Sequence, residues 1–77
     1  MHLEHDREAD AVYITLREGT YAYGDDLGSE RRIDYESSGE PLGIELLNVS
    51  HGVDIDDLPE SEEVGRLLAA HDIRVFA

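Results

Sequence analysis

The pattern of apolar residues predicts an α+β fold: a four-stranded antiparallel β-meander with one C-terminal helix packed on one face, and a short final strand. Residues 11–47 contain runs in which apolar and polar side chains alternate, the period of half-buried strands. Residues 64–71 instead repeat apolar side chains at helical spacing. The 77 residues fit a single domain, with the meander over 5–50 and the helix and final strand over 54–77.

Each predicted strand carries its own alternation. In the first, Val12, Ile14 and Leu16 share one face. The predicted strands cover 11–16, the region of Tyr21 and Tyr23, 31–36 and 42–47, with turns at Glu18-Gly19, around 25–28 and at 37–40. Glycine at position 19 suits a tight hairpin turn, so we expect two consecutive hairpins.

The helix is expected to begin with a capping box. Asp57 is the candidate cap and Glu60 lies three residues on, with Ser61 as a competing cap. Val64 and Leu68 then lie on one face, and Asp72 is expected to end the helix. The predicted core consists of Val12, Ile14, Leu16, Ile33, Tyr35, Leu42, Ile44 and Leu46 on the sheet and Val64, Leu67 and Leu68 on the helix.

The opposite sheet face is predicted to be mainly polar. It carries Tyr13, Thr15, Arg32, Asp34, Glu45 and Leu47. Arg32 and Glu45 are expected to form a cross-strand ion pair, an ordinary source of sheet stability. Tyr13 and Leu47 are either scattered surface residues or the centre of a dimer contact. We favour the dimer, because so small a domain without cysteine has few other means of stabilisation.

The charge of the chain limits its partners. Nineteen acidic residues face six basic residues, all arginine, for a net charge of -13. This balance argues against binding nucleic acid, and no apolar run is long enough for a membrane span. The N-terminus does not resemble a secretory signal, so we expect a cytoplasmic protein. The lack of lysine fits either a high-salt habitat or a GC-rich genome.

Asp6, Glu8 and Asp10 form the densest group of ligand-type side chains, close to His5. Their spacing does not match a calcium loop, and a turn with carboxylates bonded to nearby backbone amides is the favoured interpretation. A divalent-metal site is the alternative. The sequence contains no nucleophile triad or phosphate loop that we can identify, so we expect no enzyme and no cofactor.

Two segments resemble a known family. Asp6-Arg7-Glu8-Ala9-Asp10-Ala11-Val12-Tyr13-Ile14-Thr15-Leu16 is similar to the opening pattern of the prokaryotic "domain of unknown function 2283" family. Ile33-Asp34-Tyr35, then Gly39, then 42–50 resembles its second block, so the resemblance covers about residues 5–50. His5 departs from the tyrosine that the family often has there. The resemblance implies no established activity, but some members resemble antitoxins by gene arrangement.

These observations predict a non-enzymatic protein-interaction module that self-associates, with a dimer favoured and an antitoxin-like role. A small basic protein is the expected partner, because complementary charge steers association. The alternative is a small-molecule or divalent-metal-binding domain that uses the acidic N-terminal turn. The candidate interaction surface consists of Asp6, Glu8, Asp10, Tyr13, Asp34, Glu45 and Leu47.

Overall fold

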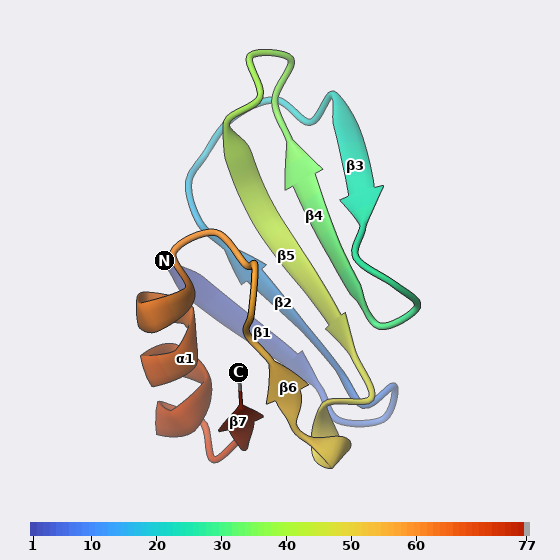
Figure 1. Cartoon of the computed structure of the whole chain (residues 1–77), viewed down its shortest axis with the longest axis vertical. Coiled ribbons are helices and arrows are strands. Elements are labelled where there is room, and N and C mark those ends of the chain that lie inside the picture. Colours follow the sequence, from blue (N-terminus) through green and yellow to red (C-terminus); the bar gives the residue numbers. More distant parts are fainter. Residues whose placement is uncertain (77) are drawn as a thin grey trace.

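The main element of the protein is a five-stranded antiparallel sheet (Figure 1). The computed structural model describes residues 1–76; Ala77, the last residue of the predicted domain, lies outside the described residues. The strands are β1 (His2–Asp6), β2 (Ala11–Thr15), β3 (Tyr23–Asp26), β4 (Arg31–Tyr35) and β5 (Pro41–Leu47). The α+β class is confirmed, but the predicted count of four strands is wrong, because β1 adds a fifth.

Strand β1 escaped prediction because its alternation is almost entirely polar. Leu3 is its only aliphatic residue, and the remaining positions are histidine or acidic. The strand nevertheless pairs with β2 along its whole length, from His2 opposite Thr15 to Asp6 opposite Ala11. Pairing with the apolar strand β2 stabilises an extended conformation that the polar sequence of β1 alone does not indicate.

The order of the strands is β1-β2-β5-β4-β3, so the predicted hairpin at Glu18-Gly19 is wrong. Strand β2 pairs with β5, and residues 16–22 instead carry the chain across the end of the sheet to β3. The first residue of this connection, Leu16, donates its backbone N–H to the Leu42 carbonyl at 2.7 Å. Only the last three strands of the predicted four-stranded meander, β3, β4 and β5, form a meander, and with β2 they make a Greek key. The arrangement places β5, the most apolar strand, at the centre.

A second layer covers one face of the sheet. It consists of α1 (Ser61–Ala70), the 3-10 turn η1 (Val49–His51) and a two-stranded parallel sheet of β6 (Val53–Asp54) and β7 (Val75–Phe76). The predicted final strand is confirmed as β7. The buried hydrophobic residues are Val12, Ile14, Leu16, Ile33, Leu42, Ile44, Leu46, Val49, Val53, Leu58, Val64, Leu68 and Ile73. All predicted core positions are therefore buried except Tyr35 and Leu67, which are half-buried.

The helix begins without the predicted capping box. Glu60 is the N-cap residue, with a left-handed φ of 53°, and no side chain caps the first turn. The Glu60 carboxylate instead accepts a hydrogen bond from Arg17, so a tertiary ion pair has replaced the local cap. The helix ends at Ala70, two residues before the predicted Asp72. No helix among the described residues is long and apolar enough to cross a membrane.

Candidate functional site

The candidate site lies on the sheet face that the second layer leaves uncovered, which we call the outer face. In Figure 1, α1, β6 and β7 all lie on one side of the sheet. The strand register places these residues, all polar except Leu47, on the other side: Glu4, Asp6, Tyr13, Thr15, Asp26, Arg32, Asp34, Glu45 and Leu47. Five of these are carboxylates and one is an arginine, so the outer face is strongly acidic.

Tyr13 is the central side chain of the outer face. Its hydroxyl donates a 2.8 Å hydrogen bond to Asp34 Oδ2, which connects β2 to β4 across the intervening strand β5. Gly43 of β5 makes this reach possible, since a Cβ built at Gly43 would lie 2.0 Å from the Tyr13 hydroxyl oxygen. The glycine therefore provides the space in which the phenol ring lies against the sheet.

The environment of Tyr13 is electrostatically negative. The pKa of Tyr13 is raised to about 12. The largest cause is burial of the phenol, followed by its hydrogen bond to Asp34 and by the negative charges of Asp34 and Glu45. The neutral phenol is thus held as a hydrogen-bond donor over a wide pH range. It is suited to binding and a poor candidate for a general base at neutral pH.

Among the described residues, Arg32 is the one arginine that the paired strands place on this face, and its contacts differ from the prediction. It lies opposite Glu45 in the register, but its Nη1 donates to Asp26 Oδ1 at 3.0 Å and its Nε lies 3.5 Å from Asp34 Oδ1. Its Nη2 also donates to the Tyr21 hydroxyl at 3.2 Å. The predicted Arg32–Glu45 ion pair is therefore wrong, because two other carboxylates compete for the same guanidinium group.

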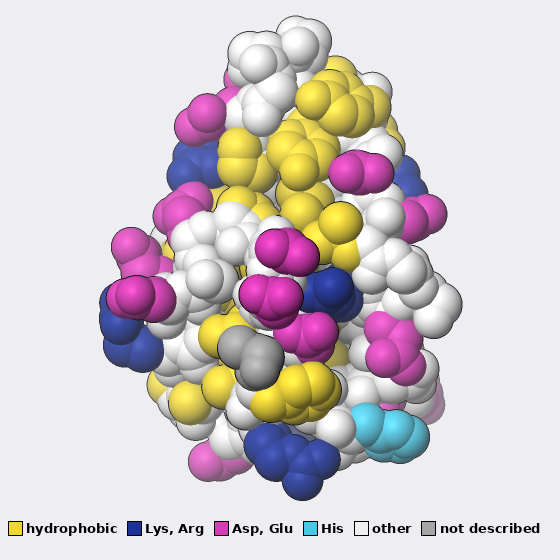
Figure 2. All heavy atoms as spheres, in the orientation of Figure 1, with side chains coloured by type: hydrophobic (Ala, Val, Ile, Leu, Met, Phe, Trp, Pro, Cys, Tyr) yellow, Lys and Arg dark blue, Asp and Glu magenta, His cyan; other side chains and the backbone are white. Residues whose placement is uncertain are grey.

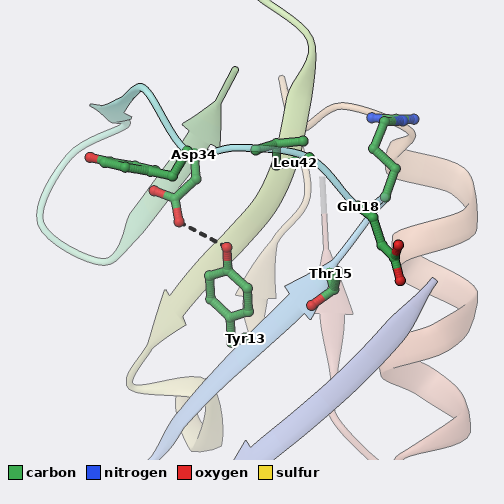
Figure 3. Close-up of a pocket in the computed structure, with 8 residues that line it drawn as sticks. Tyr13, Thr15, Glu18, Asp34 and Leu42 are labelled. Carbon is green, nitrogen blue, oxygen red and sulfur yellow. Dashed lines mark hydrogen bonds between the residues drawn. The ribbon is translucent and has the colours of Figure 1, made fainter. Parts of the chain in front are cut away.

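A hollow of about 510 Å³, which we call the outer pocket, opens beside Tyr13 (Figure 3). It is lined by Tyr13, Thr15, Arg17, Glu18, Gly19, Tyr21, Asp34 and Leu42. The connection between β2 and β3 supplies four of these residues, 17–19 and Tyr21. These four were not predicted as site residues, because the pattern of their segment indicates a hairpin turn and a strand.

The predicted acidic turn has a structural role. Asp6 Oδ1 accepts the Ala9 backbone N–H at 3.1 Å, which confirms the expected local bond. Asp10 accepts the Ser50 backbone N–H at 3.0 Å and the Ser50 hydroxyl at 2.7 Å, and so ties this turn to η1. Within residues 1–76, no group of three or more histidine, aspartate or glutamate side chains is arranged to hold a metal ion.

The structure brings together only part of the predicted interaction surface. Tyr13, Asp34, Glu45 and Leu47 share the outer face with Asp6, and the Leu47 side chain is 40% exposed there. Glu8 and Asp10 lie in the turn between β1 and β2, at the end of this face.

The fold and the site define a small two-layer α+β domain with one open, acidic sheet face. Its sequence belongs to the family described as "Protein of unknown function (DUF2283)", whose family model matches residues 2–50. The match covers the whole five-stranded sheet, including Tyr13, Asp34 and Glu45, and ends before α1. No curated protein and no solved structure gives a significant match.

Proposed function

We propose that this chain is a non-enzymatic protein-interaction module whose outer face binds a basic protein partner. The observation that carries the proposal is the imbalance of charge on an uncovered sheet face, where the paired strands place five carboxylates and one arginine. A partner rich in arginine or lysine would complement this face, and opposite charge speeds encounter and selects the partner.

The carboxylates of the outer face are not equally engaged. Arg32 is shared between Asp26 and Asp34, and among the described residues no ion pair involves Glu4, Asp6 or Glu45. Basic side chains of a partner would supply the missing counter-charges. The Tyr13 ring, in the middle of β2, and Leu47, at the end of β5, offer apolar contact on the same surface.

The antitoxin-like role expected from the family resemblance is a specific form of this proposal, in which the partner is a small basic toxin. The alternative of a metal or small-molecule site in the acidic turn has less support. The carboxylates of Asp6 and Asp10 already accept hydrogen bonds from Ala9 and Ser50.

Self-association is a second candidate, through a different surface. The acidic outer face would repel a second copy of itself, so we place the dimer contact on the other side of the sheet. Tyr23 and Tyr35 stack there with ring centroids 5.1 Å apart, and Tyr23 is 45% exposed. Figure 2 shows apolar side chains gathered over these ends of β3, β4 and β5, where α1 does not cover the sheet.

Light scattering tests this dimer contact. It should find a dimer at micromolar concentration for the wild type and a monomer for Tyr23→Ser. A monomeric wild type would contradict this candidate.

Calorimetric titration with a short peptide of alternating lysine and glycine tests the primary proposal. The double variant Glu4→Gln/Glu45→Gln should bind about tenfold more weakly than the wild type, because two exposed ion pairs are lost. Glu62→Gln/Glu63→Gln on α1 is the matched control, with the same change of charge on the covered side. Equal weakening by both double variants would show that net charge alone drives binding and would refute the proposal.

A further inference from the structure

The outer pocket differs from the rest of the outer face because it is concave as well as charged. The rings of Tyr13 and Tyr21 and the aliphatic side chain of Leu42 line it. Figure 3 shows the carboxylates of Glu18 and Asp34 on opposite sides of the hollow, with Tyr13 and Thr15 between them. Its volume of about 510 Å³ lies in the range of pockets that bind ligands.

Arg17 lines the pocket but is engaged by groups outside its lining, and Arg32 pairs with one of the two lining carboxylates, Asp34. Arg17 donates to the Pro41 carbonyl and to Glu60, and its Nε lies 3.4 Å from Glu40 Oε1. Arg32 is held by its contacts with Tyr21 and two aspartates. Glu18 takes part in no ion pair among the described residues. Glu18 therefore contributes to the pocket lining a negative charge that none of these arginines neutralises.

We propose that the outer pocket receives the guanidinium group of an arginine side chain from the basic partner. This inference rests on the proposed function and adds the specificity-determining contact. A guanidinium group is planar and has several N–H donors, so it can bond to Glu18 and Asp34 at opposite sides while its face lies on a phenol ring. A lysine ammonium is compact and strongly hydrated, and it lacks the planar face and the fork of donors that would contact the phenol ring and both carboxylates.

The test is an amide chemical-shift titration of the whole chain with a capped Gly-Arg-Gly peptide. The control peptide replaces arginine by citrulline, which keeps the shape of the side chain and removes its charge. We expect saturable shifts at Thr15, Glu18, Tyr21 and Asp34 with the arginine peptide, and much smaller shifts with citrulline. Equal shifts with both peptides would overturn the inference.

A matched pair of variants assigns the effect to the pocket. Glu18→Gln should weaken binding of the arginine peptide at least threefold, about the change expected for one partly exposed ion pair. Glu62→Gln removes the same charge from the exposed first turn of α1, outside the pocket and the outer face, and should leave the affinity unchanged. Equal weakening by both variants would refute a site at Glu18.

The outcome also separates this inference from the proposed function. If the lysine–glycine peptide binds the outer face while the arginine peptide leaves the pocket amides unshifted, the pocket inference fails and the proposed function stands. If neither peptide binds, both fail.

Discussion

The position of the Tyr13 side chain on the outer face depends on one glycine, Gly43. The side chain leaves β2, crosses the bare backbone of Gly43 and bonds to Asp34 on β4. A larger residue at position 43 would separate the two partners, and the floor of the outer pocket would change with them. The outer face therefore depends on a residue that offers no functional group of its own.

Tyr13→Phe tests the contribution of this hydrogen bond. The variant should lose about 1 kcal/mol of unfolding free energy at neutral pH, a typical value for one partly exposed bond. Since the folded state raises the pKa of Tyr13 from 10.0 to about 12, it favours the neutral phenol. The resulting stabilisation is present below pH 10 and is lost as pH rises towards about 12.

Urea unfolding across this pH range measures the effect. The wild type should lose more stability than Tyr13→Phe between pH 10 and about 12. Parallel pH profiles would contradict the account of Tyr13.

Gly43→Ala tests the close approach directly. The new methyl group would occupy the place of the phenol oxygen, so the Tyr13 ring must rotate away and leave Asp34. We expect a loss of about 1–3 kcal/mol, the usual cost of overpacking. The Tyr13 and Asp34 resonances should both shift. A variant with wild-type stability and unchanged shifts would show that the ring does not need this space.

Asp10 joins the β1–β2 turn to η1. It has a left-handed φ of 54° and bonds to both polar groups of Ser50. Asp10→Ala should cost about 2 kcal/mol, because alanine disfavours this φ and cannot accept either bond. Asp10→Asn tolerates the φ and keeps an acceptor oxygen, so it should cost clearly less in thermal unfolding. Equal losses would show that the tether contributes little.

An element could be predicted from the sequence where the pattern of neighbouring residues determines it, and could not where a distant part of the chain does. Strands β2, β4 and β5 were predicted because alternation marks one buried face, and α1 because Val64 and Leu68 have helical spacing. The position of β2 beside β5 could not be predicted, since it depends on a pairing about 30 residues apart along the chain. The start of α1 was wrong for the same reason, because a distant arginine takes the capping carboxylate.

The site was predicted as far as strand alternation determines it. Tyr13, Asp34, Glu45 and Leu47 were correctly placed on one face, because a period of two decides the side on which a residue lies. Glu18 and Tyr21 were missed as site residues because only the crossing of the connection brings them to the pocket. The choice of Arg32 between three nearby carboxylates depends on side-chain geometry that the pattern does not contain.

For the whole molecule, the charge of -13 is the dominant electrostatic property. Only two of the six arginines, Arg17 and Arg32, form ion pairs among the described residues, so most carboxylates face solvent without a counter-charge. Salt should therefore stabilise the fold by screening repulsion more than it weakens these few pairs. Thermal unfolding from low to molar salt should show a rising Tm, and a constant or falling Tm would contradict this expectation.

We propose that the chain has two functionally different sides: one packs against the second layer to form the core, and the other binds a basic partner. The most direct test is amide chemical-shift mapping with the lysine–glycine peptide, which needs no contribution from the arginine pocket. We expect shifts confined to outer-face residues of β1, β2, β4 and β5, such as Glu4, Tyr13 and Glu45. Shifts centred on the acidic first turn of α1, or spread evenly over all acidic segments, would contradict it.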